Sequence, residues 1–297
     1  NIYLYTEMIT CDSFLHTNRK NYVVKEGEKN LTIQLAGSDP KKYGQCASII
    51  EEQGYDEINL NIGCPSSKVV KGEFGACLMN NPEKVADCVY EIKKSCDLPV
   101  SIKTRLGLGY EENLDLLFTL INKTKSSGCS KYIIHARNAI LNGLSPKKNR
   151  KIPLLRYADV TTVKNSFPDL EFYLNGGVED ISEIKKNIDK FDGLMIGRRI
   201  YDNPMFLNEI EEQIYNNEET LSRKSILEKY LKYALSLQNK DTSNYLLLRH
   251  LFSLYYNTSS SKKWKKFLHD IIQSDKEIEL ITNFEESTYG EEIKAYR

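Results

Sequence analysis

Short apolar segments rich in β-branched residues alternate with longer segments of helical periodicity as far as Ile196. The expected strands are Ile2–Met8, Leu31–Ala36, Glu57–Ile62, Val100–Thr104, Tyr132–His135, Glu171–Leu174 and Gly193–Ile196. The helical segments between them are Lys41–Gln53, Pro82–Ser95, Asn113–Ser126, Tyr157–Asn165 and Ile181–Asn187. Strands that alternate with helices predict an α/β protein whose parallel sheet is covered on both faces.

Two observations favour a closed barrel over an open doubly wound sheet. The expected strands end in polar, glycine-rich sequences such as Lys103-Thr104-Arg105 and Asn175-Gly176-Gly177, and barrel enzymes carry their chemistry at that end. No GxGxxG motif follows the first strand, which weakens a dinucleotide-binding sheet. A (β/α)8 TIM barrel needs eight strands. We therefore expect its first strand to precede Asn1 and to be missing from this chain.

Downstream of the last expected strand the sequence becomes rich in Glu, Lys, Leu and Tyr at helical spacing, as in Ile226–Leu237 and Tyr245–Tyr256. Only a weak strand pattern returns, near Ile278–Ile281. We expect a TIM-barrel domain over residues 1–215 and a small all-helical domain over residues 216–297.

Charge and cysteine content restrict partners and compartment. The 41 basic residues balance the 41 acidic ones, so a nucleic-acid partner would need a local basic patch. The seven cysteines form no CxxC pair, which argues against a zinc knuckle or a disulfide framework and for reduced thiols. We expect no metal site. No apolar run is long enough to span a bilayer, and no signal or transit peptide is visible. We expect a cytoplasmic protein without membrane contact, although the abrupt start at Asn1 leaves an organelle open.

Glycines follow the last two expected strands, in Asn175-Gly176-Gly177 and in Gly197-Arg198. Glycine lets the backbone approach a ligand closely, and the loops after the last two strands of a barrel commonly hold a phosphate. Either motif alone is explained by a tight turn. Their joint placement favours a phosphate site, to which Arg198 adds charge.

Three polar residues at earlier strand ends favour an electron-rich cofactor. Lys103 lies within an apolar run, and His135 ends the next strand. The alternatives are a lysine that extends from the barrel rim and a hydrogen-bonded core histidine. Together, above a phosphate site, they suit a flavin, which gains negative charge on accepting hydride. Gln34 could add a hydrogen bond to the flavin edge.

A long loop follows the third expected strand and contains Cys64 between Gly63 and Pro65. Long loops inside compact domains are usually functional, and a thiol can give up a proton near neutral pH. Cys64 is therefore a candidate catalytic acid. We interpret five other cysteines as small buried hydrophobic residues: Cys46, Cys77, Cys88, Cys96 and Cys129.

Two clusters of basic residues lie outside the strands. One consists of Lys147, Lys148, Arg150 and Lys151, and the other of Lys262, Lys263, Lys265 and Lys266 around Trp264. Each alone is explained as a solvated face, but the pair could form one RNA-binding surface. Trp264 would then either pack its helix against neighbours or stack on a base.

Taken together, these residues resemble the tRNA-dihydrouridine synthases. The motifs that carry the resemblance are Asn61-Ile62-Gly63-Cys64-Pro65, Lys103-Thr104-Arg105, Ile134-His135-Ala136-Arg137, Asn175-Gly176-Gly177, Gly193-Leu194-Met195-Ile196-Gly197-Arg198 and Asn203-Pro204. Stretches that resemble the A subfamily are Leu4-Tyr5-Thr6-Glu7-Met8, Gly75-Ala76-Cys77-Leu78-Met79 and Gly143-Leu144-Ser145-Pro146-Lys147-Lys148-Asn149-Arg150. The resemblance runs from Tyr3 to about Leu207 and is weaker beyond, at Arg249-His250 and around Trp264.

The resemblance implies an FMN enzyme, reduced by NADPH, that passes hydride to C6 of a D-loop uridine in tRNA while Cys64 protonates C5. We further expect a monomer. It implies flavin ligands at Gln34, Lys103, His135, Asn175, Gly176, Gly177, Gly197 and Arg198. It implies tRNA contacts at Asn61, Arg137, Lys147, Arg150, Lys262 and Lys265. This sequence departs from the family in having lysines where arginine is usual near the C-terminus, and in lacking the family's opening Ala-Pro-Met-type strand.

Two other functions share parts of this pattern. A flavin barrel reductase of a small molecule, orotate-like or an enone, would need the same flavin site without the basic helical domain. A non-catalytic tRNA-binding protein would keep the fold but not the turnover, and the presence of Cys64, Lys103 and His135 argues against it.

Overall fold

The computed structural model describes residues 2–16, 24, 28–237, 242–273 and 277–284. The chain divides into two compact units. The first comprises residues 1–178 and 186–195, and the second residues 179–185 and 196–297. The last passage of the chain from the first unit to the second falls at Ile196. The predicted domain boundary lies further downstream, at residue 215, and stays a prediction.

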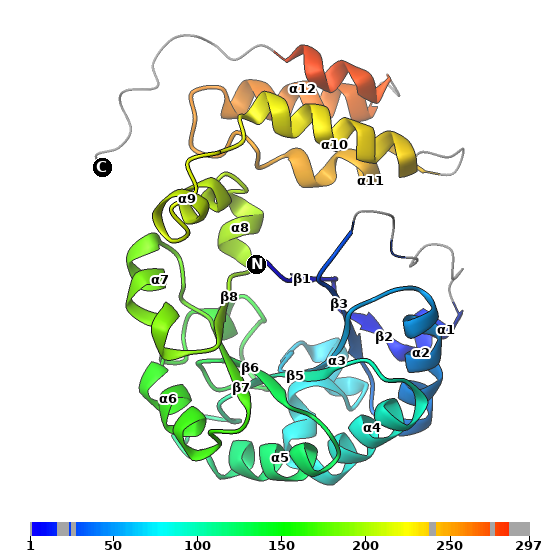
Figure 1. Ribbon diagram of the computed structural model, residues 1–297, viewed down its shortest axis with the longest axis vertical. Helices are drawn as coiled ribbons and strands as arrows, with labels where there is room; N and C mark the ends of the chain where they lie inside the picture. The colour runs from blue at the N-terminus through cyan, green and yellow to red at the C-terminus, as the bar shows by residue number, and fades with distance from the viewer. Residues whose placement is uncertain (1, 17–23, 25–27, 238–241, 274–276, 285–297) are drawn as a thin grey trace. The chain divides into compact units, whose positions relative to one another are not determined.

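The first unit contains a sheet of parallel strands that follow one another in chain order, β1-β3-β4-β5-β6-β7-β8 (Figure 1). The strands are β1 (Leu4–Tyr5), β2 (Ile9–Thr10), β3 (Leu31–Ala36), β4 (Glu57–Ile62), β5 (Val100–Arg105), β6 (Lys131–His135), β7 (Glu171–Asn175) and β8 (Gly193–Met195). In a doubly wound sheet the strand order reverses at a switch point, whereas in a TIM barrel it does not. The predicted TIM-barrel-like α/β class is therefore confirmed, and β8 pairs only with β7 among the described strands.

Within the first expected strand, Ile2–Met8, only β1 (Leu4–Tyr5) is regular strand, and β2 (Ile9–Thr10) begins after its expected end; both pair with β3. Thr6 lies between them, and its Oγ1 accepts the backbone N–H of Gln34 at 3.0 Å. A side-chain oxygen thus takes the place of a carbonyl in the ladder, and the regular strand is interrupted there.

Helices cover the outer face of this sheet, and α2, α4, α5 and α6 follow one another along its outside (Figure 1). The helices of the first unit are α1 (Cys11–His16), α2 (Pro40–Glu52), α3 (Ser67–Lys71), α4 (Pro82–Ser95), α5 (Asp115–Ser126) and α6 (Tyr157–Ser166), with 3-10 turns η2 (Gly75–Asn80), η3 (Lys148–Arg150) and η4 (Ile188–Lys190). Asp39 and Asn81 accept backbone N–H groups at the starts of α2 and α4, each followed by proline in the first turn. Sequence and structure therefore agree closely on where these two helices begin.

The two faces of the central strands differ in polarity. In β4, Ile58, Leu60 and Ile62 belong to the buried apolar core, whereas Glu57, Asn59 and Asn61 alternate with them on the other face. The register places Asn59 opposite Ser101 and Asn61 opposite Lys103. The strands that the sequence analysis described as apolar segments thus carry a buried polar layer on their second face.

The second unit is helical in its described residues. After α7 (Ile181–Asn187), which spans the boundary between the units, its elements are α8 (Arg198–Asp202), α9 (Phe206–Gln213), α10 (Arg223–Leu237), α11 (Asn244–Leu248), η5 (Arg249–Leu251), α12 (Ser261–Gln273) and η6 (Ile278–Asn283). The expected weak strand at Ile278–Ile281 is wrong. Ile278 and Ile281 are both buried, and a 3-10 turn places residues three apart on one side.

Trp264 packs inside this unit and does not stack on a ligand. Its side chain has no exposed surface, and its Nε1 donates to the carbonyl of Leu251 at 2.7 Å. The rings of Tyr255 and Phe284 each lie 4.9 Å from the indole, measured between centroids. Of the two interpretations made from the sequence, packing is the one that the structure supports.

Across the described ranges, no helix has the length and apolar character needed to cross a membrane. In the same ranges no group of three or more His, Cys, Asp or Glu side chains is arranged to hold a metal ion.

Candidate active site

Predicted site residues from several strands meet at the carboxyl end of the sheet in the first unit. Gln34, Asn61, Lys103, His135 and Asn175 lie near the ends of β3 to β7. Lys103 Nζ donates to Asn175 Oδ1 at 2.9 Å, and Asn61 Nδ2 donates to Gln34 Oε1 at 2.8 Å. Parallel strands bring their carboxyl ends to one edge, where barrel enzymes place their chemistry.

Lys103 is a partly buried cation at the centre of this group. Burial, together with the nearby charge of Arg105, lowers the pKa of its ammonium from the ordinary value to about 8. An anion that binds beside Lys103 stabilises its protonated form. Lys103 therefore does not simply extend from the rim into solvent; it forms part of the polar layer.

The turn after β7 requires glycine at both positions. Gly176 and Gly177 have φ angles of +97° and +77°, a region that side chains rarely adopt. A Cβ on Gly176 would lie 2.9 Å from Nε2 of His135, so this backbone is pressed against the imidazole. The turn is held from outside by Tyr157, whose hydroxyl donates to the Gly176 carbonyl at 2.8 Å.

Asn175 holds the same turn from inside. Its Nδ2 donates to the carbonyl of Met195 on β8 at 2.8 Å, while its Oδ1 accepts from Lys103. Its side chain therefore links β5, β7 and β8 at their carboxyl ends.

The backbone of Cys64 is fixed on both sides. Asn61 Oδ1 accepts the N–H groups of Gly63 at 3.2 Å and of Cys64 at 3.0 Å. The Cys64 carbonyl accepts the N–H of Ala76 at 3.0 Å, and Gly75 has a φ of +68° where a side chain would collide with that carbonyl. Cys64 itself is only partly buried, while its backbone is held.

The remaining cysteines follow the sequence interpretation with one exception. Cys46, Cys88, Cys96 and Cys129 are buried. Cys77 is only partly buried, so that expectation is wrong. It lies on the 3-10 turn η2, and its Sγ donates to the Phe74 carbonyl at 3.0 Å.

Arg105 is a site residue that the sequence interpretation missed. Its buried guanidinium donates to three carbonyls: Gly63 at 3.2 Å, Asn138 at 3.1 Å and Asn149 at 3.1 Å. It thereby ties the turn before Cys64 to the loop after β6. The signal was present, because an arginine next to a buried strand is costly unless several acceptors meet it.

Several predicted residues lie apart from this cluster or have other partners. Asn61, expected to meet tRNA, is committed to the Cys64 turn and to Gln34. Arg137 donates to the carbonyl of Pro153. Lys147 is exposed, and Arg150 is partly buried at the end of η3.

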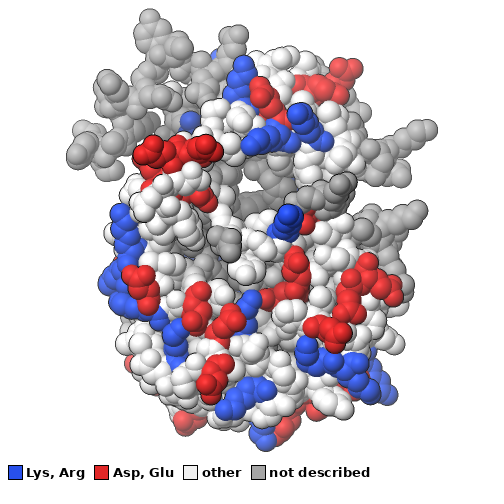
Figure 2. Space-filling model, viewed as in Figure 1, with Lys and Arg blue, Asp and Glu red and all other residues white. Residues whose placement is uncertain are grey.

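The other predicted ligands belong to the second unit. Gly197 and Arg198 are exposed at the start of α8, and Lys262 and Lys265 are exposed on α12. Their roles as ligands stay predictions. On the face that Figure 2 shows, basic and acidic side chains are interspersed, in keeping with the balanced charge.

Strands wound in chain order, with a polar cluster at their carboxyl ends, define a TIM-barrel-type enzyme. The family model described as dihydrouridine synthase matches residues 1–291. The chain belongs to the dihydrouridine synthase family.

Curated relatives agree with this assignment. The chain is 40% identical over 270 residues to the tRNA-dihydrouridine(20/20a) synthase of Synechocystis sp., covering 90% of this chain and 80% of that protein. It is 38% identical over 273 residues to the enzyme of the same name from Escherichia coli K12, covering 91% of this chain and 79% of that one. A solved structure of morphinone reductase in complex with tetrahydroNAD aligns with a TM-score of 0.41 and 13% identity, over 58% of this chain and 47% of that one.

Proposed function

We propose that this chain reduces the C5–C6 double bond of uridine in the D-loop of tRNA to dihydrouridine, with FMN, NADPH as reductant and Cys64 as proton donor. The observation that carries the proposal is the Cys64 turn. It contains a partly buried cysteine whose backbone is held at both its N–H and its carbonyl, beside the strand ends that carry Gln34, Lys103 and His135.

The residues at the strand ends fit a flavin. An anion beside Lys103 would offset the burial that lowers the pKa of this lysine to about 8, and a reduced flavin gains negative charge. The glycine turn brings backbone close to His135 without side chains between them. Gln34, Lys103, His135, Asn175, Gly176 and Gly177 would hold the cofactor.

When bound and reduced, the flavin supplies the hydride that adds to C6 of the uracil ring. Saturation of the double bond then needs one proton at C5. The Cys64 thiol donates that proton, and the resulting thiolate recovers a proton from solvent. The fixed backbone of Cys64 keeps the donor in one position while the ring is reduced.

The substrate must enter as an extruded base, because a stacked uridine cannot reach the rim. Extrusion costs a few kcal/mol and least in a loop. The exposed lysines Lys147, Lys262 and Lys265 would bind the phosphates of the tRNA. The names of the relatives specify positions 20 and 20a, and we propose the same uridines here, reduced by a cytosolic monomer.

The test is a single-turnover reaction of the reduced protein with an unmodified tRNA transcript, comparing wild type with C64A. We expect C64A to bind FMN and tRNA normally and to lose at least about a hundredfold in the rate of dihydrouridine formation, the usual contribution of a general acid. C77A, at the other partly buried cysteine, is the matched control and should keep the wild-type rate. Undiminished reduction by C64A would exclude Cys64 as the acid.

Salt dependence distinguishes a tRNA enzyme from a reductase of a small molecule. Phosphate contacts make affinity fall steeply as salt rises. We expect the KM for tRNA to rise with salt and no turnover of a free uracil or orotate analogue. Turnover of the free base with a salt-independent KM would favour the small-molecule reductase.

A further inference from the structure

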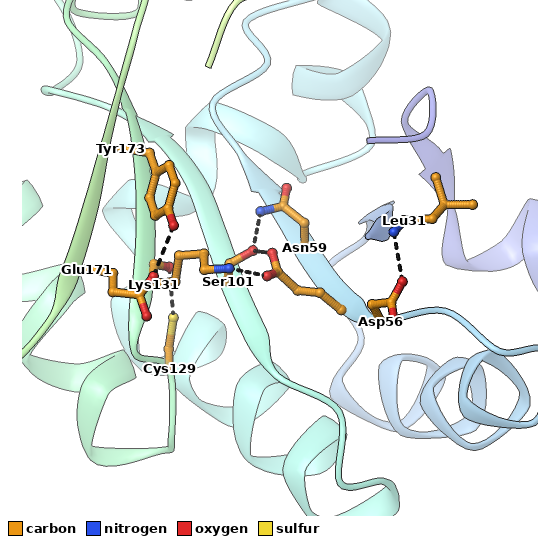
Figure 3. Close-up of polar contacts among 9 residues, drawn as sticks. Leu31, Asp56, Asn59, Ser101, Cys129, Lys131, Glu171 and Tyr173 are labelled. Atoms are coloured by element: carbon orange, nitrogen blue, oxygen red, sulfur yellow. Dashed lines mark hydrogen bonds and ion pairs between the residues drawn. The ribbon is translucent and has the colours of Figure 1, made fainter. Parts of the chain in front are cut away.

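A continuous row of hydrogen bonds crosses the polar interior of the sheet and ends at Cys64. At its lower end, Glu57 accepts Lys131 Nζ and the Ser101 hydroxyl, each at 2.5 Å. The side chain of Glu57 is only 5% exposed, and that of Lys131 is 15% exposed. Figure 3 shows Asn59, Ser101 and Lys131 linked in this part of the row.

The upper part of the row consists of side-chain amides. Asn59 Nδ2 donates to Ser101 Oγ at 2.7 Å, and Gln34 Nε2 donates to Asn59 Oδ1 at 2.7 Å. Asn61 Nδ2 donates to Gln34 Oε1 at 2.8 Å, and the Cys64 N–H donates to Asn61 Oδ1 at 3.0 Å. Every donor in the row therefore points toward Glu57.

The two ends of the row leave only this direction. A carboxylate can only accept, and a backbone N–H can only donate. Because Glu57 takes the single Ser101 hydroxyl proton, Ser101 must accept from Asn59. Each amide above it is then fixed in turn, until Asn61 presents its oxygen to the Cys64 turn.

We propose that Glu57 is a positioning residue for the Cys64 turn. Its negative charge sets the direction of this row of hydrogen bonds through Ser101, Asn59, Gln34 and Asn61, hereafter the relay, which holds Cys64 and orients Gln34. The proposal rests on the proposed function only where it says what the ordered Cys64 turn does in the reaction. The relay itself is a property of the protein without cofactor or substrate.

Replacing Glu57 with glutamine tests the direction, because an amide has one accepting end and one donating end. If the amide oxygen meets Ser101, the amide nitrogen faces the ammonium of Lys131, and two donors oppose each other. If the nitrogen meets Ser101 instead, the hydroxyl must donate to Asn59. Each amide above then reverses, and Asn61 presents its nitrogen to the Cys64 N–H. In either orientation one buried pair consists of two donors.

Removal of the lysine should relieve this conflict. In the double variant E57Q/K131M the amide nitrogen no longer faces an ammonium, so the oxygen can accept from Ser101 and the relay keeps its direction. Tyr5 also faces Glu57, whose charge adds to burial in raising the pKa of that phenol. A phenol can accept a hydrogen bond as well as donate one, so Tyr5 is compatible with the double variant.

The measurement is hydrogen exchange of the Cys64 amide in the full chain labelled with 15N-cysteine, with the Cys64 signal assigned by its loss in C64S. In E57Q we expect exchange at Cys64 to rise about tenfold, the change that loss of one satisfied hydrogen bond produces. In E57Q/K131M we expect it to return to within about twofold of wild type. Buried Cys88 and Cys129 serve as references within the same molecule.

D192N is the matched control, because Asp192 also accepts a lysine, Lys164 Nζ at 2.6 Å, and a further donor, the Phe172 N–H at 2.8 Å, but lies outside the relay. It should leave Cys64 exchange unchanged. Should E57Q not fold, S101A interrupts the same relay and is expected to raise Cys64 exchange. The proposal is overturned by unchanged Cys64 exchange in E57Q or S101A, by a rise shared equally with Cys88 and Cys129, or by a double variant that stays like E57Q. None of these hydrogen-exchange measurements needs flavin or tRNA, so their outcome is independent of the C64A assay.

Discussion

Gly176→Ala should destabilise the first unit through two separable effects. The first is the backbone: a φ of +97° costs an L-residue roughly 1–2 kcal/mol. The second is a collision, because the added Cβ would lie 2.9 Å from Nε2 and 3.0 Å from Cε1 of His135. His135 is buried, so its ring cannot leave easily, and overpacking of this kind costs about 1–3 kcal/mol.

A matched variant separates these effects. Gly109 has a φ of +75°, and nothing lies within 4 Å of the position of its Cβ. G109A should therefore show the backbone cost alone, about 1 kcal/mol after the stabilising effect of a stiffer unfolded chain. G176A should cost about 3 kcal/mol in free energy of unfolding.

The assay is urea-induced unfolding followed by circular dichroism, with the slope of the transition compared between variants. Equal slopes would show that the change lies in stability. The same difference should appear as a melting temperature about 5 °C lower for G176A than for G109A. If the two variants are destabilised equally, the contact between Gly176 and His135 is not the constraint described above.

Three further predictions concern other parts of the molecule. K103M should flatten the pH dependence of stability between pH 8 and about 10.4. In the wild type, Lys103 loses its proton near pH 8 in the folded chain and near pH 10.4 in the unfolded chain. The unfolded chain therefore binds more protons in that window, and wild-type stability rises with pH there. Melting temperatures measured across this range check it, and an identical rise in K103M would refute it. W264A should lose about 3–5 kcal/mol of stability because the indole is fully buried; a loss under about 1 kcal/mol by circular dichroism would contradict its place in the core. K262M/K265M should reduce the slope of log affinity for tRNA against log salt by about two, whereas K123M, whose lysine pairs with Glu83, should not change it.

The elements that the sequence predicted well carry strong local signals. Leu31–Ala36 and Glu57–Ile62 were predicted with the bounds that the structure gives, because β-rich runs are bounded there by turn residues. The helices that begin at Pro40 and Pro82 follow capping residues. The candidate site was reached through motifs at strand ends, which the topology brings to one edge.

What the sequence did not predict depends on contacts between distant residues. Asn59 and Ser101 lay inside runs interpreted as apolar strands, and only the register of β4 against β5 reveals that they bond to each other. The short elements α3 and η2 were expected to be loop, since five or six residues are too few to show a helical period. The interruption at Thr6 depends on a bond to Gln34, 28 positions away.

The most direct measurement is the mass of nucleosides from an unmodified tRNA transcript after incubation with this protein, FMN and NADPH. We expect uridine in the D-loop to gain two hydrogens, and to gain none when NADPH is omitted. A protein that binds FMN and oxidises NADPH yet leaves every uridine of the transcript unchanged would contradict the account.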